Sequence, residues 1–228
     1  MKAAAIVMVK NEENYIRQVL ACALQALPVA YVADTGSTDS TREEVRNARK
    51  AGCNLYLFEF GPQTPRQLVT VREELGGVAR RQGHDWGFLI DGDELYYPRA
   101  LKAVLDEGMP KGRRLGFVSN VTVDNRDGEM WAMDDIFSRT LVYPLADRWV
   151  VTDGPAEYPW ECPESFMHKD EFHYFQTPGD LIAHGLHLHR LVRSRRDGEV
   201  MRRLEKQRQF GMVDKNVGWL GPLQEWPE

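Results

Sequence analysis

FLIDGDELYYP, at residues 88–98, joins a hydrophobic run to an acidic turn. Three apolar residues precede three carboxylates within four positions, Asp91, Asp93 and Glu94. Taken alone, this pattern also fits an exposed loop, because Asp and Gly favour turns and charged side chains mostly stay at the surface. The surrounding sequence has to decide between a solvated turn and a site.

Hydrophobic strands and amphipathic helices alternate ahead of this turn. Residues 3–9 are uninterrupted apolar sequence, which is typical of a parallel strand covered on both faces. The same reasoning predicts strands at 29–34, 54–60 and 86–90 and helices at 11–27, 40–52 and 68–78. This order predicts an α/β fold with a doubly wound, mostly parallel sheet flanked by helices.

Two helix starts carry capping residues. Asn11 is a candidate N-cap of the first helix, and Ser40 with Glu43 has the spacing of a capping box at the start of the second. We therefore expect both side chains to bind the first turn of their helices.

Polar loops follow three of the four predicted strands. They are KNEE at residues 10–13, DTGSTD at 34–39 and DGDE at 91–94. In open α/β sheets ligands bind outside the carboxyl ends of the strands. The three loops are therefore expected to meet at one edge of the sheet and to form a site there.

The pattern changes after residue 98. A short helix is predicted at 99–107, strands at 114–123 and 136–142 around the DNRDG turn, and irregular chain at 153–165. A basic helix is predicted at 197–210. No repeat or linker interrupts this sequence, so we expect one domain over residues 1–228 whose second half is a smaller mixed layer.

Composition excludes several classes of protein. The chain has 228 residues and a net charge of -5, which argues against a protein that coats nucleic acid. Cys22, Cys53 and Cys162 lack the spacing of a zinc site, which favours a reducing, cytoplasmic location. No apolar run reaches the roughly 18 residues that cross a bilayer, and the apolar start is too short for a signal peptide.

Common phosphate-binding loops are missing from the sequence. It contains neither GxxxxGK[ST] nor a GxGxxG after the first strand, and Leu95 stands where a calcium loop needs an oxygen ligand. Two carboxylates at a strand end, Asp91 and Asp93, can instead face one hard cation that holds phosphate oxygens. The sequence therefore predicts that a divalent metal holds any bound phosphates.

Three stretches together resemble a known family. AIVMVKNEENYI (5–16), VADTGSTDST (32–41) and DWGFLIDGDEL (85–95), in this order, are similar to the amino-terminal half of family 2 glycosyltransferases, nucleotide-sugar enzymes of the GT-A fold. The resemblance covers about residues 3–105 and is weak beyond them. It implies a nucleotide-sugar-binding half at 1–105, and an acceptor-binding half with a helical tail at 106–228.

The resemblance also implies a reaction. A sugar would pass from a nucleoside diphosphate sugar, most simply a UDP-sugar, to an acceptor hydroxyl with inversion and with help from Mn²⁺ or Mg²⁺. The acceptor class stays open between a saccharide, a lipid-linked sugar, a protein and a modified DNA base.

Donor-binding positions follow from the resemblance. They are Val9, Lys10, Asn11, Glu12, Asp34, Thr35, Gly36, Ser37, Arg72, Asp91 and Gly92. Arg193, in the basic segment described below, is a further candidate. Asp34 would accept hydrogen bonds from the base or ribose, although many relatives carry a second acid where this chain has Thr35. Arg72 would face the site, or alternatively solvent from its helix.

Catalytic positions follow in the same way. Asp93 would bind the metal, with Asp91 approaching the ribose or the metal through water. Glu94 would accept a sugar hydroxyl, or only cap the turn. The general base would come from Asp134, Asp135, Glu157 or Glu161, with Glu157 first because Gly154–Glu157 resembles the Gly-x-x-His-Glu stretch of relatives with Ala156 in place of the histidine.

Histidines are concentrated in the segment AHGLHLHR. His187 and His189 share a face of an extended strand. The resemblance implies that a histidine in this segment binds the metal or a phosphate, so both are candidate metal ligands, whereas each histidine, His184 included, can also simply pack.

Basic residues are concentrated in the segment that follows. Residues 190–208 carry eight basic and three acidic side chains, a local charge of +5. They fit a solvated helix face, a diphosphate clamp through Arg193 or Arg195, or a polyanionic acceptor. In the tail, Trp219 and Trp226 could stack on a sugar or base, or pack on the core.

Three hypotheses follow. The first is the glycosyltransferase. The second keeps the fold but uses the basic segment to modify a hydroxylated base in nucleic acid. The third is a nucleotide-sugar-binding protein without catalysis, suggested by the altered stretch at residues 154–157.

Overall fold

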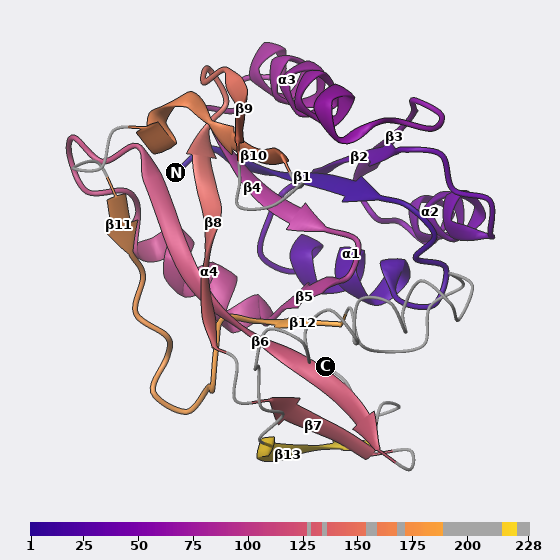
Figure 1. Cartoon of the computed structure of the whole chain (residues 1–228), viewed down its shortest axis with the longest axis vertical. Coiled ribbons are helices and arrows are strands. Elements are labelled where there is room, and N and C mark those ends of the chain that lie inside the picture. The colour runs from indigo at the N-terminus through magenta and orange to yellow at the C-terminus, as the bar shows by residue number, and fades with distance from the viewer. Residues whose placement is uncertain (127–128, 134–135, 154–158, 168–171, 189–215, 223–228) are drawn as a thin grey trace.

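The structure, a computed structural model, describes residues 1–126, 129–133, 136–153, 159–167, 172–188 and 216–222. Four parallel strands form the first half of its large sheet (Figure 1). They are β1 (Ala3–Val9), β2 (Ala30–Asp34), β3 (Leu55–Glu59) and β4 (Trp86–Asp91). The four strands predicted from the sequence are confirmed to within one residue at each end.

The strand order places a ligand edge between β1 and β4. The order is β3-β2-β1-β4, with every pair parallel. The chain therefore moves outward from β1 to β3 and returns to β4 on the other side of β1. The strand order therefore reverses between β1 and β4, and ligands bind at such a point in open α/β sheets.

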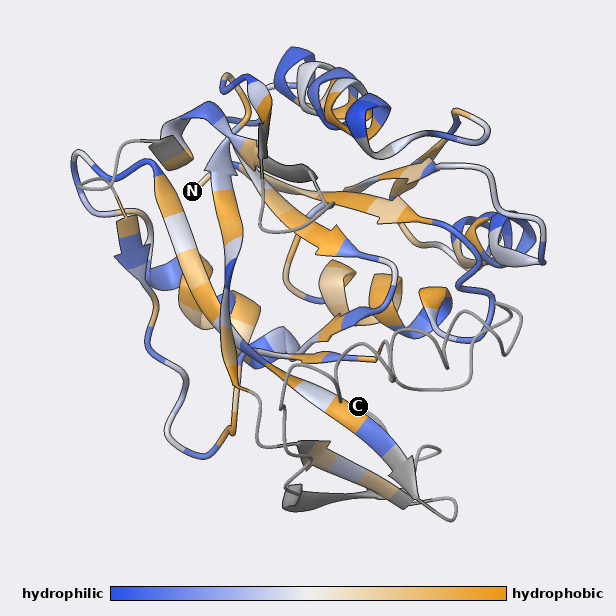
Figure 2. Ribbon diagram, viewed as in Figure 1, coloured by the Kyte–Doolittle hydropathy of each residue, from blue (hydrophilic) through white to orange (hydrophobic). Residues whose placement is uncertain are grey.

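Helices cover both faces of these strands. They are α1 (Ile16–Leu24), α2 (Thr41–Lys50), α3 (Pro65–Arg81) and α4 (Pro98–Glu107). Ala5 and Val7 of β1 share a core with α1, α2 and α4, whereas Ile6 shares a second core with α3. Figure 2 accordingly shows β1 hydrophobic along most of its length and α3 with hydrophilic outer positions. Burial on both faces explains the unbroken apolar sequence of β1.

The two predicted helix caps are wrong. Asn11 has a left-handed backbone (φ 57°) and lies well before α1 begins. Ser40 is the N-cap residue of α2 but makes no side-chain capping bond. Instead, the backbone N–H of Thr41 donates to Oδ1 of Asp39 at 3.0 Å. The carboxylate of Asp39, one position before Ser40, thus accepts a hydrogen bond at the start of α2 in place of the predicted capping box of Ser40 and Glu43.

Most of the second half of the large sheet is antiparallel. Its strands are β5 (Glu94–Tyr96), β6 (Leu115–Arg126), β7 (Glu129–Met133), β8 (Phe137–Pro144), β11 (Phe172–Tyr174), β12 (Gly185–His187) and β13 (Asn216–Pro222). β8 pairs between β4 and β6, and β7 and β13 extend the sheet from the far end of β6 (Figure 1). The strands predicted at 114–123 and 136–142 are confirmed as β6 and β8, which pair with each other, but a further strand, β7, lies between them in the sequence after DNRDG.

A separate hairpin lies against α3. It consists of β9 (Trp149–Asp153) and β10 (Pro159–Pro163), and the short 3-10 helix η1 (Glu164–Met167) follows it. The expectation of irregular chain at 153–165 is corrected at residue 153 and at 159–165, and residues 154–158 lie outside the described ranges. Both prolines lie at the ends of β10, where a missing N–H is tolerated.

Candidate active site

The carboxyl ends of β1, β2 and β4 lie side by side. Val9 is paired with Asp34 and Met8 with Asp91 in the strand registers. The backbone N–H of Gly92 donates to the carbonyl of Met8 at 2.8 Å, which fixes the start of the acidic turn to β1. The three polar strand ends therefore meet at one edge, as their sequence positions predict.

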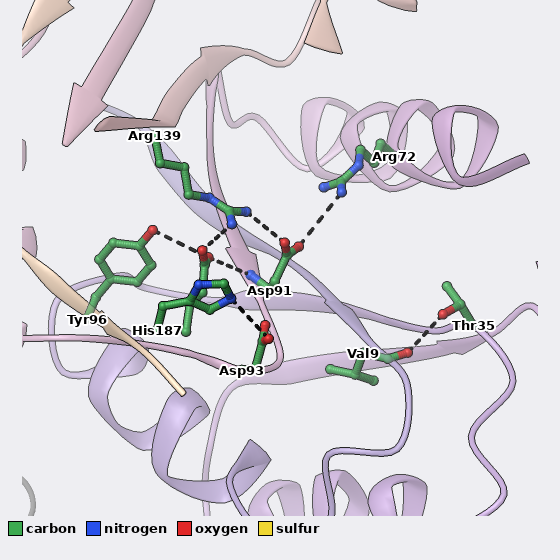
Figure 3. A network of polar contacts seen from close by, with 9 residues as sticks. Val9, Thr35, Arg72, Asp91, Asp93, Tyr96, Arg139 and His187 are labelled. Carbon is green, nitrogen blue, oxygen red and sulfur yellow. Dashed lines mark hydrogen bonds and ion pairs between the residues drawn. The ribbon is translucent and has the colours of Figure 1, made fainter. Parts of the chain in front are cut away.

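Two of the loops are held together by direct hydrogen bonds. The N–H of Asn11 donates to Oγ of Ser37 at 3.0 Å, and the N–H of Thr38 donates to Oδ1 of Asn11 at 2.8 Å. Thr35 Oγ1 donates to the carbonyl of Val9 at 3.1 Å (Figure 3). The left-handed backbone of Asn11 thus serves this contact between loops. Lys10, beside it, is exposed.

Asp34 is buried beneath the second loop. Its Oδ1 accepts hydrogen bonds from the N–H groups of Gly36 and Ser37 at 3.2 and 3.1 Å. Its Oδ2 is buried and has no hydrogen-bond partner among the described residues. A buried acceptor without a partner is unfavourable, so this oxygen is suited to an N–H or O–H of a ligand.

Asp91 lies between two arginines (Figure 3). Nη2 of Arg139, from β8, lies 3.0 Å from Asp91 Oδ2, and Nη2 of Arg72, from α3, lies 3.8 Å from Oδ1. Burial alone would raise the pKa of Asp91, but the two guanidinium groups hold it below its usual value. Asp91 is therefore an anion at neutral pH, and Arg72 is at the site and not on the solvent side of its helix.

Arg72 also contacts the β9–β10 hairpin. Its guanidinium carbon lies 5.0 Å from the ring centroid of Trp149, the first residue of β9. The backbone N–H of Trp149 donates to Oε1 of Glu73, the residue after Arg72 on α3, at 2.9 Å. The hairpin is thus attached to the helix that supplies one of the cations around Asp91.

Glu94 is fully buried beside Asp91. One of its oxygens is paired with Arg139, and the other accepts hydrogen bonds from the N–H of Asp91 at 3.1 Å and from the hydroxyl of Tyr96 at 3.4 Å. Burial raises the pKa of Glu94 to about 7, although Arg139 opposes this shift. Glu94 was predicted to contact a sugar hydroxyl, but its side chain has no exposed surface through which a sugar could reach it.

Asp93 faces a histidine on the opposite side of the turn. His187 Nε2 lies 3.2 Å from Asp93 Oδ2, and the carbonyl of Asp93 accepts the N–H of Leu188 at 2.7 Å. β12 pairs antiparallel with β5, and this pairing sets His187 opposite Glu94. Burial would lower the pKa of His187, but the hydrogen bond and charge of Asp93 raise it above its usual value.

The histidines separate into different environments. His184 is buried away from the acidic turn, and its Nδ1 accepts from the N–H of Ser119 at 3.3 Å and lies 3.2 Å from Oγ1 of Thr177. His184 is therefore a packed residue, one of the alternatives considered for it. His189 lies outside the described residues.

Several predicted functional residues also lie outside the described parts of the chain. They are Glu157, Asp134, Asp135, Arg193, Arg195 and Trp226, together with the rest of the basic segment at 190–208. Glu161 is on β10 and Trp219 on β13. The roles given to all of these residues stay predictions.

Arg139 was not identified from the sequence. The available signal was an arginine inside β8, FSRTLVYP, whose other side chains are apolar or hydroxylated. A charge in such a strand points to a buried partner.

Comparison with known proteins places this geometry in context. No protein-family model matches the chain, and no curated protein matches it. Among solved structures, S. aureus TarS aligns with 91% of this chain at 19% identity and a TM-score of 0.53. A mannosyltransferase from Pyrobaculum calidifontis, in complex with GDP-Man and Mn²⁺, aligns with 54% at 18% identity and 0.42. Glucosyl-3-phosphoglycerate synthase from Mycobacterium tuberculosis, in complex with Mn²⁺, UDP and its product, aligns with 55% at 18% identity and 0.39.

The comparisons differ in how much of each protein they cover. This chain spans 39% of TarS, 36% of the mannosyltransferase and 44% of the synthase. The likeness to TarS supports the predicted α/β fold of the GT-A type. Within the described residues no helix is long and apolar enough to cross a membrane.

Proposed function

We propose that this chain, which has the GT-A fold of nucleotide-diphospho-sugar transferases, is an inverting, metal-dependent glycosyltransferase of the family 2 type. Its donor is a nucleoside diphosphate sugar, most simply a UDP-sugar, and its acceptor is a hydroxyl group. The observation that carries the proposal is the meeting of Asp34, Asp91 and Asp93 at one sheet edge, where ligands bind in this class of fold.

Asp34 supports the binding of a nucleoside. Its buried Oδ2 needs a donor, and the N3–H of uracil is one. The loops bound to each other through Asn11 and Ser37 provide polar backbone groups beside it. A guanine base also offers N–H donors, so the choice of UDP is tested against GDP.

Asp93 and His187 support the binding of a divalent cation. Two donors on one octahedral ion, each about 2.1 Å from it, lie about 3 Å apart. The 3.2 Å between Asp93 Oδ2 and His187 Nε2 fits this spacing, and a carboxylate with an imidazole suits Mn²⁺. Nothing in the described ranges brings three or more His, Cys, Asp or Glu side chains together as a metal cage. Diphosphate oxygens and water would therefore complete the coordination.

The reaction needs a base that takes the proton of the acceptor hydroxyl. We assign Glu157 to this role, with the acceptor hydroxyl as its proton source. Residues 154–158 connect the two strands of the hairpin, and Trp149 at the start of β9 lies against Arg72 beside Asp91. A bound Mn²⁺ or Mg²⁺ would neutralise charge on the leaving diphosphate.

Thermal-shift measurements with Mn²⁺, UDP, GDP and their combinations test the proposal. A ligand that binds the folded state raises the melting temperature by mass action. We expect small shifts with Mn²⁺ or a nucleotide alone and a large shift with UDP and Mn²⁺ together, because neither is fully coordinated without the other. EDTA should abolish both this shift and hydrolysis of the donor.

Asp93→Ala is the matching variant. It removes a carboxylate from the site and no core packing, so the folded protein should persist without the combined shift. Full donor hydrolysis in EDTA, or an unchanged shift in Asp93→Ala, would contradict the proposal.

A further inference from the structure

The three carboxylates of the acidic turn have different partners. Asp91 and Glu94 both form ion pairs with Arg139, whereas the contact of Asp93 described above is with His187. Figure 3 shows Arg139 beside Asp91 and His187 beside Asp93. Arg139 comes from β8, a strand 45 residues beyond Glu94 in sequence. An arginine from the antiparallel half of the sheet therefore pairs with two of the three carboxylates of the turn, Asp91 and Glu94, and Asp93 is paired with a histidine.

Glu94 has no access to a ligand. Its side chain has 0% exposure, and both oxygens are used by Arg139, Tyr96 and the N–H of Asp91. Tyr96 in turn accepts a hydrogen bond from Nδ2 of Asn120 at 3.0 Å. A chain of hydrogen bonds thus runs from the core of β6 through Glu94 to Arg139.

Asp91 lies next to Arg139 at the end of this series of hydrogen bonds, and its side chain is partly exposed. Its side chain keeps 34% exposure while one oxygen is bound by Arg139. A planar guanidinium can contact two carboxylates at a fixed angle, which a lysine ammonium does not reproduce. The orientation of Asp91 therefore depends on where Glu94 holds Arg139.

We propose that the buried Arg139–Glu94 pair is a positioning device for Asp91: it fixes that carboxylate toward the donor nucleotide and leaves Asp93 with His187 to take the cation. Arg139 and Glu94 are positioning residues that act through Asp91. This inference rests on the proposed function and replaces the sugar contact predicted for Glu94 with a role inside the protein.

A charge-neutral double variant tests the pair. At a pH well above the pKa of Glu94, about 7, Asp91, Asp93 and Glu94 carry -3 and Arg72 and Arg139 +2, a net charge of -1 with His187 neutral, so binding is measured there. Arg139→Met with Glu94→Gln removes one charge of each sign, so the net charge stays -1. Removing Arg139 alone would leave a buried carboxylate without its cation, which is strongly destabilising, whereas replacing both partners is tolerated far better.

The readout is the affinity for UDP in the presence of Mn²⁺, measured by calorimetry. We expect the double variant to lose tenfold or more, and its residual binding still to require Mn²⁺ because Asp93 and His187 are unchanged. Asp91→Asn should lose a similar factor. When the three substitutions are combined, the losses should not multiply, because the pair acts through Asp91. Donor hydrolysis should show the loss mainly in KM.

Two controls keep the test decisive. Arg46→Met removes an exposed arginine of α2 whose ion pair is with Glu59 of β3 and not with the acidic turn, and it should bind UDP as the parent does. If the double variant fails to fold, Arg139→Lys keeps the charge but not the two-sided contact, and we expect the same loss from it.

The outcomes separate the two proposals. Parent-like UDP affinity in the folded variants, or losses that multiply with Asp91→Asn, would overturn the positioning role alone. Unaltered protein that binds neither UDP nor GDP with Mn²⁺ would overturn the proposed function and this inference with it.

Discussion

Gly36→Ala is expected to distort the loop at residues 34–39 for two separable reasons. Gly36 has φ +97°, a conformation that costs an L-residue about 1–2 kcal/mol. A Cβ at this position would also lie 2.6 Å from the backbone N of Pro62 and 2.7 Å from its Cα. Backbone atoms cannot rotate aside as a side chain can, so we add about 1–3 kcal/mol for forced packing.

The two contributions together predict a clear change in stability. Their sum is about 2–5 kcal/mol, which corresponds to a fall in melting temperature of roughly 4–20 °C for a chain of this size. The shifted loop should also weaken UDP binding, because the N–H of Gly36 donates to Asp34. Urea denaturation and calorimetry of the variant measure both effects.

Two other glycines supply matched controls. Gly52 has φ +102° and nothing within 4 Å of its Cβ position, so Gly52→Ala isolates the backbone contribution of about 1–2 kcal/mol. Gly179 has open space and no positive φ, so Gly179→Ala should change stability by less than about 0.5 kcal/mol. The reasoning is refuted if Gly36→Ala is no more destabilising than Gly52→Ala.

Three further predictions concern single side chains. Asp34→Asn should keep the fold and weaken UDP binding roughly 10- to 150-fold in calorimetry, the value of a hydrogen bond to a charged group; unchanged affinity would show that Oδ2 does not contact the nucleotide. Burial lowers the pKa of His184, so the unfolded chain binds a proton that the folded one does not, and stability is lost as pH falls below about 6.5. His184→Gln should therefore lose less stability than the parent between pH 7.5 and 5.5, by up to about 1.4 kcal/mol per pH unit in urea titrations, and equal losses would contradict this assignment. Burial raises the pKa of Cys22 to about 11. Ellman's reagent at pH 8 should therefore modify the half-buried Cys53 in the folded protein and Cys22 only after unfolding, which mass spectrometry of peptides measures. Equal labelling rates of the two cysteines would count against the burial of Cys22.

The parallel half of the fold is predictable because its sequence signals are local. The apolar run of β1 indicates burial on both faces, and the polar loops after β1, β2 and β4 indicate the sheet edge where a ligand is expected to bind. These two rules are enough to bring Asp34, Asp91 and Asp93 together from the amino-acid sequence alone.

The rest of the site depends on pairings that no local pattern encodes. Arg139 is a site residue only because β8 pairs beside β4. His187 differs from His184 only because β12 pairs with β5 in a register that sets it opposite Glu94. The β9–β10 hairpin was missed because its prolines resemble loop sequence, although they lie at strand ends.

The capping errors have a related cause. Asn11 and Ser40 have the sequence signature of helix caps, but neighbouring loops compete for them or replace them. Asn11 binds Ser37 and Thr38 across the site, and Asp39 supplies the oxygen at the start of α2. Tertiary contacts at a functional edge overrode local preference in both cases.

Anomalous diffraction from crystals soaked with Mn²⁺ and UDP tests the central claim most directly. We expect a manganese peak within bonding distance of the Asp93 carboxylate and His187 Nε2, with the diphosphate of UDP on the same ion and the uracil beside Asp34. Bound UDP without manganese at this pair, or manganese at another position, would contradict it.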